Sequence, residues 1–184
     1  MELRGSTVAG IGSYVPEEIL SNEDLEKMVD TSDEWIINHT GIRERRVIPD
    51  DEATSDLAVR AAERALEDAG TEAADLDLII CATVTSDTVF PATAAVLEDK
   101  LGANRAATFD LVTGCTGYAA AMITGSQYIQ TGAYDNILIL AAESLTRITN
   151  WEDRSTCVLF GDGAGAAVLQ PSKPDTGLLA FDMD

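Results

Sequence analysis

The sequence lacks long apolar runs and has few cysteines. Its apolar segments are short, strand-like pieces such as Leu78–Ala82, far below the ~18 apolar residues needed to cross a bilayer. The N-terminus shows no basic stretch followed by an apolar one, as a secretory signal would. Three cysteines, an odd number at long spacings, give neither a disulfide framework nor a paired metal motif. These absences predict a protein without metal, membrane span or disulfides, in a reducing compartment, most simply the cytoplasm.

Positive charge is also scarce. Twelve Lys and Arg face 32 Asp and Glu, which gives a formal net charge of -20, and lysine occurs only at Lys27, Lys100 and Lys173. Such a charge repels nucleic acid and anionic membranes, so neither is an expected partner. The acidic surplus fits either a solvated acidic face or adaptation to high salt, where screening makes a dense acidic surface tolerable.

Length and periodicity indicate one globular unit. The 184 residues are 46% hydrophobic and 24% charged, as in ordinary globular domains. Strand-like and helix-like segments alternate, which predicts an α/β fold with a mostly parallel sheet and helices on both of its faces. Ser21 and Thr31 are the predicted N-caps of the first two helices. The predicted strands are Val8–Val15, Arg43–Ile48, Asp77–Thr83, Ala106–Leu111, Asn136–Ala142, Thr156–Phe160, Ala164–Leu169 and Gly177–Phe181, and the predicted helices are Asn22–Val29, Ser32–His39, Thr54–Ala69, Ala92–Leu101 and Cys115–Thr131.

Cys115 differs from the other cysteines because it falls where a predicted strand turns into a predicted helix. Gly114 and Gly117 flank it, and glycines permit a tight turn with room for a substrate. The unsatisfied N–H groups of a helix N-terminus favour a thiolate, the nucleophilic form of cysteine. Cys81 and Cys157 lie in apolar strand-like segments and are predicted to be buried structural residues. On geometry alone, Cys115 is either a catalytic nucleophile or a buried capping residue.

Other local signals are weaker. His39, the single histidine, is predicted at a helix end and offers no obvious base for a cysteine nucleophile. The segment Gly161–Ala166 precedes a strand and lacks the spacing of a dinucleotide-binding loop, so it predicts a tight turn packed against a neighbouring strand. Trp151 lies three residues before Arg154. An aromatic ring beside an arginine can hold an adenine and a phosphate, and it is also a common packing arrangement.

Four segments match one known family in order and spacing. They are Thr31–Ile36, Thr40–Arg45, Asp110–Gly117 and Phe160–Leu169. Together they resemble β-ketoacyl-acyl-carrier-protein synthase III, and the likeness runs over essentially the whole chain but covers only the N-terminal half of that family. It implies a thiolase-like fold, in which two similar halves stack as α-β-α-β-α layers and members work as homodimers. Residues 1–184 would then be the N-terminal thiolase-like half-domain, with the C-terminal half absent from this chain.

The resemblance also implies a reaction. Family members start fatty acid synthesis by moving an acyl group from acyl-CoA, such as acetyl-CoA, to a cysteine. Malonyl-acyl carrier protein then loses CO2 and attacks the resulting thioester. CoA is thus part of a substrate, and no separate cofactor is implied. Cys115 matches the acylated nucleophile of the family.

The resemblance assigns further roles to individual residues. Trp35 and Arg154 match positions that grip the adenine end of CoA, with Thr31 nearby. Phe90 matches an aromatic residue that reaches across the dimer to shape the acyl pocket. His39 stands where the family usually has a CoA-contacting arginine, a departure that either weakens a phosphate contact or is offset by a neighbouring group.

The family's catalytic histidine and asparagine, and one oxyanion-hole N–H, belong to its C-terminal half. These groups stabilise negative charge during condensation, and nothing in this chain aligns with them. The resemblance therefore predicts that a complementary C-terminal half is needed to complete the reaction. The alternatives are a related condensing enzyme, such as a specialised-metabolite priming synthase or a hydroxymethylglutaryl-CoA synthase, and a non-catalytic half-subunit scaffold. Cys115 argues against a scaffold, which needs no reactive thiol.

Overall fold

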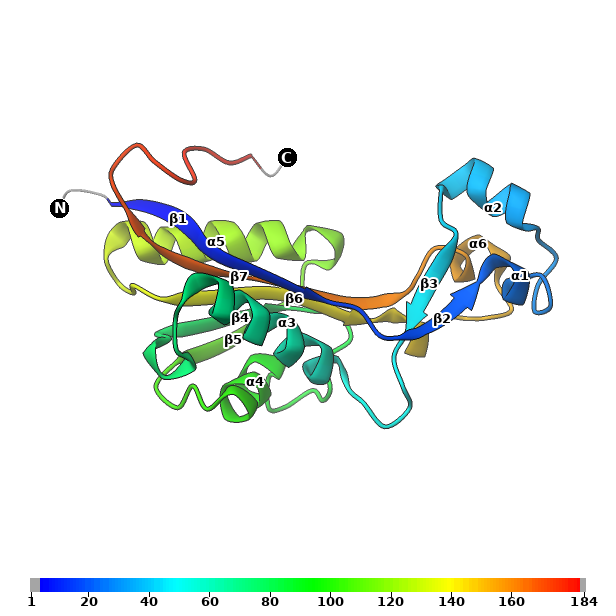
Figure 1. Ribbon diagram of the computed structural model, residues 1–184, viewed down its shortest axis with the longest axis horizontal. Coiled ribbons are helices and arrows are strands. Elements are labelled where there is room, and N and C mark those ends of the chain that lie inside the picture. Colours follow the sequence, from blue (N-terminus) through cyan, green and yellow to red (C-terminus); the bar gives the residue numbers. More distant parts are fainter. Residues whose placement is uncertain (1–3, 183–184) are drawn as a thin grey trace.

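The computed structural model describes residues 4–182. A five-stranded sheet with helices on both faces forms its main part, and a smaller part extends from one end of the sheet (Figure 1). The strands are β1 (Gly5–Tyr14), β2 (Glu18–Ser21), β3 (Glu44–Val47), β4 (Leu78–Ala82), β5 (Ala107–Leu111), β6 (Ile137–Ser144) and β7 (Asp162–Ser172). The helices are α1 (Asn22–Leu25), α2 (Asp33–Thr40), α3 (Thr54–Ala69), α4 (Thr93–Leu101), α5 (Gly117–Thr131) and α6 (Arg154–Cys157). Within residues 4–182, none of the helices has the length and apolar character of a membrane span.

The five-stranded sheet is mixed. Its strand order is β1-β7-β6-β4-β5, with β4 parallel to β5 and β6, and β7 antiparallel to β6 and β1. The predicted α/β class is therefore confirmed, although parallel and antiparallel pairs are equally represented. The antiparallel direction of β7 leaves no trace in the apolar pattern of that strand, because pairing direction depends on the path of the chain.

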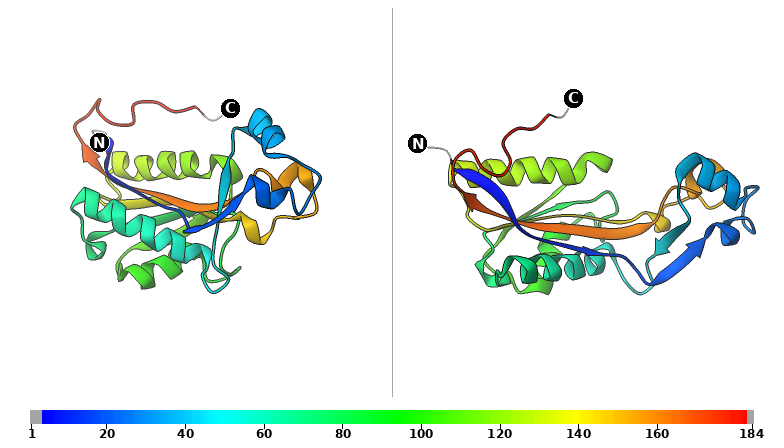
Figure 2. Two further views of the ribbon diagram at one scale, coloured as in Figure 1. Left: turned by 45° about the vertical axis from the view of Figure 1, so that its right-hand side comes forward. Right: turned by 45° about the horizontal axis from the view of Figure 1, so that its top comes forward.

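Alternate residues of β4 pack on opposite faces of the sheet. Ile79 and Cys81 belong to the core beneath α3 and α4, whereas Leu78 and Ile80 belong to the core beneath α5. Figure 2 (right) shows α5 on one side of the sheet and α3 and α4 on the other. A strand that is buried on both faces has a continuous apolar run, which is why the sequence indicates β4 so clearly.

Two glycines let α3 lie directly on β1. A Cβ added at Gly10 would come within 2.3 Å of the Ala69 nitrogen, and one at Gly12 would come within 2.2 Å of the Ala61 carbonyl oxygen. Both neighbours are backbone atoms, so no side-chain rotation could make room. The glycines interspersed in the first predicted strand are therefore required by the contact between helix and strand.

The smaller part, called the small lobe below, consists of β2, β3, α1, α2 and α6. Strands β2 and β3 pair antiparallel, and the core of the lobe contains Leu25, Ile36, Cys157 and Val158. The five-stranded sheet with α3, α4 and α5 is called the body. Figure 1 shows the small lobe at the end of the body where β1 ends and β7 begins.

Two predicted strands are wrong. The expected strand Thr156–Phe160 overlaps helix α6, which begins after Asp153 because the side chain of Asp153 accepts a hydrogen bond from the Ser155 N–H. The expected strand Gly177–Phe181 makes a single bridge, between Gly177 and Ser6. Gly177 has a φ of 83°, a left-handed conformation that interrupts an extended chain.

The helices of the small lobe also differ from the prediction. α1 has the expected cap, Ser21, but ends at Leu25 rather than Val29. The N-cap of α2 is Ser32, whose side chain accepts the Trp35 N–H, and not Thr31. Strand β2 has no counterpart among the predicted strands, because its four residues show no alternating burial and are ordered by pairing with β3.

Candidate active site

Cys115 lies in a short 3₁₀ turn, Gly114–Thr116, between the end of β5 and the start of α5. Its side chain is exposed, whereas Cys81 and Cys157 are buried, as their apolar surroundings in the sequence predict. Gly114 has a φ of 60°, in the region where glycine pays no steric penalty. The local sequence therefore folds so that this thiol is presented to solvent.

Gly117 brings the first turn of α5 onto the sheet. A Cβ added there would lie 2.8 Å from the Ala82 Cβ at the end of β4, so a larger residue would push the helix away from the strand. α5 begins at this glycine, two residues later than predicted. The turn holds Cys115 at the edge formed by the carboxyl ends of the parallel strands β4, β5 and β6, where open α/β sheets commonly carry ligand sites.

The Cys115 side chain lines a cavity of about 420 Å³. The lining residues come from the ends of β4 and β6, the start of α5 and the segments that follow β6 and precede β7, and most of them are apolar. They are Ala82, Val84, Gly114, Cys115, Tyr118, Ala141, Glu143, Leu145 and Phe160. An apolar cavity with a few polar groups beside a thiol suits an apolar acyl group.

Glu143 and Tyr118 are the polar parts of this wall. The Glu143 carboxylate accepts hydrogen bonds from the Val84 N–H at 2.9 Å and from the Thr85 hydroxyl at 2.5 Å, so the segment after β4 holds it in place. Burial raises the pKa of the Tyr118 phenol, and a phenol is neutral at neutral pH even without that shift. Tyr118 lies beside Cys115 because it is in the first turn of α5. No local sequence pattern marks Glu143, because the strand order of the sheet brings it to Cys115.

Asp110 on β5 fastens the start of α4. Its two carboxylate oxygens accept the Thr93 N–H at 2.7 Å and the Ala94 N–H at 2.8 Å, in the way that a helix-capping side chain does. These bonds anchor the segment that carries Phe90, whose side chain is 88% exposed. Phe90 does not line the cavity described above, so its role in an acyl pocket completed across a dimer stays a prediction.

Three of the residues predicted to contact CoA meet in the small lobe. Trp35 on α2 stacks with His39, with ring centroids 4.2 Å apart and 24° between the planes. The Arg154 guanidinium, from α6, lies 4.4 Å from the centroid of the Trp35 ring. Nη1 of Arg154 also donates to the Asp30 carbonyl oxygen at 2.9 Å. The structure thus brings together an aromatic face, a guanidinium and an imidazole from two helices.

Thr31, the fourth residue of this set, precedes α2. Its Oγ1 is buried and has no hydrogen-bond partner among residues 4–182. Nδ1 of His39 lies 2.7 Å from the Trp35 carbonyl oxygen, and a carbonyl only accepts, so this nitrogen carries the hydrogen. His39 does not line the cavity beside Cys115.

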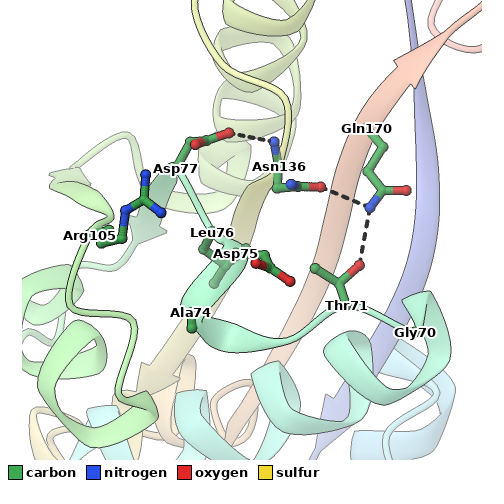
Figure 3. A pocket seen from close by; sticks show the side chains of 9 residues that line it. All are labelled: Gly70, Thr71, Ala74, Asp75, Leu76, Asp77, Arg105, Asn136 and Gln170. Atoms are coloured by element: carbon green, nitrogen blue, oxygen red, sulfur yellow. Dashed lines mark hydrogen bonds between the residues drawn. The ribbon is translucent and has the colours of Figure 1, made fainter.

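Another cavity, of about 330 Å³, lies at the opposite edge of the sheet (Figure 3). It surrounds the amino-terminal ends of β4 and β6. There Nε2 of Gln170 donates to Asn136 Oδ1 at 2.9 Å and to Thr71 Oγ1 at 3.1 Å, so these polar groups satisfy one another. The cavity contains none of the predicted site residues. Over residues 4–182, no three His, Cys, Asp or Glu side chains are grouped so that they could hold a metal ion.

The chain is similar to known proteins in sequence. The family model for 3-oxoacyl-[acyl-carrier-protein (ACP)] synthase III matches residues 109–184. The β-ketoacyl-[acyl-carrier-protein] synthase III of Geobacillus kaustophilus is 54% identical over 179 residues, which are 97% of this chain and 58% of that protein. Over nearly its whole length, the chain is similar to β-ketoacyl-acyl-carrier-protein synthase III. It spans somewhat more than half the length of the curated relatives that it matches.

Solved structures agree with this family. The 3-oxoacyl-[acyl-carrier-protein] synthase III from Aquifex aeolicus VF5 has a TM-score of 0.89 at 45% identity, over 91% of this chain and 54% of that one. The priming β-ketosynthase from the R1128 polyketide biosynthetic pathway has a TM-score of 0.91 at 39% identity, over 96% of this chain and 52% of that one. The predicted resemblance to this family and the predicted thiolase-like half-fold are thereby confirmed.

The segment matched by the synthase III family model contains part of the candidate site. It includes the Cys115 turn and Arg154. The other predicted site residues lie before it, namely Thr31, Trp35, His39 and Phe90.

Proposed function

We propose that the chain is the acyl-accepting half of a β-ketoacyl-acyl-carrier-protein synthase III, with Cys115 as its nucleophile. The observation that carries this proposal is the exposed Cys115 thiol on the wall of an apolar cavity of about 420 Å³. The complete enzyme would condense acyl-CoA, such as acetyl-CoA, with malonyl-acyl carrier protein to give 3-oxoacyl-acyl carrier protein and CO2. This reaction would begin fatty acid biosynthesis.

The part of this chain in that reaction is acyl transfer. Cys115 Sγ attacks the thioester carbonyl carbon of acyl-CoA, the bond from that carbon to the CoA sulfur breaks, and CoA leaves as a thiol with the proton that Cys115 gives up. In the second step, malonyl loses CO2, its C2 carbon bonds to the acyl carbonyl carbon, and the Cys115 sulfur leaves. This step needs oxyanion stabilisation, which family members draw from their C-terminal half. We therefore expect the chain alone to accept an acyl group but not to condense it.

The small lobe would hold the CoA end of the substrate. Trp35 offers an aromatic face for adenine, and Arg154 offers a guanidinium for phosphate. Arg154 already lies 4.4 Å from the centroid of the Trp35 ring, so a base could enter between them only if Arg154 swings aside. The His39 ring adjoins this place, and Thr31 lies in the segment just before α2. His39 would replace the arginine that the family usually has.

Further partners complete the proposal. A second copy of the chain would form a homodimer in which Phe90 reaches the partner's acyl pocket, and the part of the relatives' length that this chain does not span would supply the histidine and asparagine. No cofactor beyond the CoA thioester is required, since each bond change involves only the substrates and Cys115. A free thiol at Cys115 needs a reducing compartment, for which the cytoplasm is the simplest choice.

The test is to incubate the chain with acetyl-CoA and locate the added acetyl group by peptide-mapped mass spectrometry. We expect acetylation at Cys115, its loss in Cys115→Ser, and unchanged labelling in the matched control Cys81→Ser, which alters a buried thiol. Labelling that persists in Cys115→Ser would contradict the proposal. If the wild-type chain is not labelled, the experiment is repeated with the C-terminal half of a family member added; continued absence of labelling would also contradict it.

One alternative retains specific support. The R1128 priming β-ketosynthase shares the fold at 39% identity, so a priming enzyme of specialised metabolism is the second candidate. Both enzymes would acylate Cys115, and they differ in the acyl group accepted. Competition between acetyl-CoA and longer or branched acyl-CoA thioesters for Cys115 distinguishes them, because a preference for acetyl-CoA favours fatty acid initiation.

A further inference from the structure

Arg45 is a buried cation at the base of the small lobe. It lies on β3 and is 4% exposed. Its guanidinium donates to the Leu20 carbonyl oxygen at 3.3 Å, to Asn22 Oδ1 at 3.0 Å and to the Val158 carbonyl oxygen at 3.0 Å. All three acceptors are neutral, and Nε of Arg45 has no partner among residues 4–182. Desolvation lowers the pKa of Arg45, although an arginine stays protonated in proteins.

Asn22 extends this network to α2. Its side chain is fully buried, and its Nδ2 donates to Asp33 Oδ1 at 2.8 Å and to the Ile42 carbonyl oxygen at 2.9 Å. Asp33 is the first residue of α2, and Ile42 lies just beyond its end. With its Oδ1 accepting from Arg45, the Asn22 amide has partners on both sides, so its orientation is fixed.

We propose that Arg45 and Asn22 are positioning residues that set the spacing between Trp35 and Arg154, and hence the fit of the nucleotide end of CoA. This inference rests on the proposed function. The bonds run from Val158, immediately after α6, through Arg45 and Asn22 to both ends of α2. α6 carries Arg154 and α2 carries Trp35, so each bond ends within about one helical turn of a residue in the stack.

The energetic cost of burying Arg45 without a carboxylate partner supports its role as a positioning residue. A buried guanidinium without a carboxylate partner is expensive, and an apolar side chain of similar size would often give a more stable core. Hydrogen bonds, in contrast to apolar contacts, fix direction as well as distance. A Cβ added at Gly161 would lie 3.0 Å from Arg45 Cβ and 3.4 Å from the Arg46 nitrogen, so the chain after α6 runs tightly against β3. A shift of Arg45 would therefore move α6.

The variants are Arg45→Met, Asn22→Asp and the control Arg46→Met. Arg46 is the next residue of β3, and its guanidinium bonds to Glu44 and to the Pro16 carbonyl at the partly exposed side of the strand. Three properties are measured on the whole chain, at a temperature where each variant is folded. They are the Kd for coenzyme A, the acrylamide quenching of Trp35 emission in a Trp151→Phe background, and the rate at which iodoacetamide alkylates Cys115.

We expect Arg45→Met to raise the Kd for coenzyme A about tenfold, which corresponds to about 1.4 kcal/mol, and to increase the quenching of Trp35. Alkylation of Cys115 in the body should stay at the wild-type rate, and Arg46→Met should match wild type in all three measurements. A Kd and a quenching constant unchanged in Arg45→Met would overturn the proposal. So would a Cys115 alkylation rate that changes in parallel, since that indicates general loosening.

Asn22→Asp distinguishes position from stability and remains informative if Arg45→Met does not fold. The new carboxylate would give Arg45 a charged partner, but it could no longer donate to Asp33 or Ile42. We expect increased quenching of Trp35 at a temperature where Asn22→Asp is folded. Wild-type quenching in Asn22→Asp would overturn the proposal. If the wild-type chain binds no coenzyme A, the proposed function of the lobe fails, whereas the quenching measurements still decide the roles of Arg45 and Asn22.

Discussion

The body and the small lobe are held together by different kinds of contact. In the body, β4 and β6 carry fully buried apolar side chains on both of their faces, such as Ile80 and Leu138. The core of the small lobe combines apolar residues such as Leu25 with the buried polar side chains of Arg45 and Asn22. Apolar burial is non-directional, whereas a hydrogen bond constrains distance and angle. Apolar packing therefore positions the turn that carries Cys115, whereas a few hydrogen bonds position Trp35 and the side chains stacked on it.

The largest expected effect comes from forcing α3 away from β1 in the body. A Cβ added at Gly10 would lie 2.3 Å from the Ala69 nitrogen and 2.6 Å from the Ala65 carbonyl oxygen. In Gly10→Ala, α3 must move off β1, and we expect a loss of more than about 4 kcal/mol in the free energy of unfolding. Urea unfolding followed by circular dichroism measures this loss.

Gly165→Ala is the matched control in the neighbouring strand β7. A Cβ added at Gly165 meets nothing within 4 Å, and its φ is not among the positive values. We expect a change within about 0.5 kcal/mol of wild type. Similar losses in both variants would show that the spacing of α3 and β1 is not what requires Gly10.

A smaller effect would show whether the body and the small lobe unfold independently. Leu138 in the body and Leu25 in the small lobe are both fully buried, so each Leu→Ala change should cost about 2–5 kcal/mol of local stability. Because the small lobe has its own core, Leu25→Ala should lower amide protection in α1, α2 and α6 and leave β4 and β6 protected. Leu138→Ala should lower protection throughout. Hydrogen exchange resolved by residue measures both; a uniform loss in Leu25→Ala would mean that the two regions unfold as one unit.

The same difference explains what could be predicted from the sequence. In the body, α3 is observed at Thr54–Ala69, as its helical periodicity predicts, because burial of one face determines that element. In the small lobe, the residues around Cys157 show the apolar pattern of a strand but form α6, since the Asp153 cap and the bond from Arg45 to Val158 fix them. Such contacts between distant segments leave no local pattern.

The candidate site divides in the same way. The Cys115 turn was accessible to prediction because the residues that shape it, Gly114 and Gly117, are its neighbours in sequence. The opposite wall of the cavity, with Glu143 and Phe160, comes from segments that reach Cys115 only through the strand order of the sheet. Predicting that wall would have required the topology as well as the elements.

A substitution of Asp162 tests how much the hydrogen bonds at the junction of the body and the small lobe contribute to stability. This carboxylate is 6% exposed and accepts the Ile48 N–H at 2.7 Å, the Thr146 N–H at 2.9 Å and the Thr146 hydroxyl at 2.5 Å. Asp162→Asn keeps the volume but turns an acceptor into a donor that faces other donors. We expect a loss of about 1.5–3 kcal/mol, measured by urea unfolding.

The control for Asp162→Asn is Asp135→Asn. Asp135 forms an ion pair with Arg4 at 2.6 Å, but its side chain is 64% exposed. Exposed pairs contribute little, so we expect a loss below about 1 kcal/mol. Equal losses in the two variants would contradict the view that the junction depends on a buried, fully bonded carboxylate.

The smallest effect concerns two carboxylates that serve the same purpose in the two regions. Hydrogen bonds from Lys27 and Ser21 lower the pKa of Asp24, at the start of α1, to about 2. At the start of α3, desolvation raises the pKa of Asp56, but the Lys100 ammonium and a backbone N–H outweigh it, so the net shift is also downward. A lowered folded-state pKa stabilises the fold above the ordinary value of about 3.9. That stabilisation is lost as the pH falls from about 4 towards the folded-state values.

Salt should distinguish these two carboxylates, because their lysine partners differ in exposure. The side chains of Lys27 and Asp24 are 72% and 42% exposed, whereas those of Lys100 and Asp56 are both 34% exposed. At about 1 M salt, screening acts mainly on exposed charges, so the pKa of Asp24 should rise further than that of Asp56. Carboxyl-carbon NMR titrations at low and high salt measure both, with Lys27→Met and Lys100→Met as the limits in which each lysine contact is gone. An equal response would mean that the small lobe shields its charged groups from salt as well as the body does. The difference between regions held by hydrogen bonds and regions held by apolar packing would then be limited to the bonds of Arg45, Asn22 and Asp162.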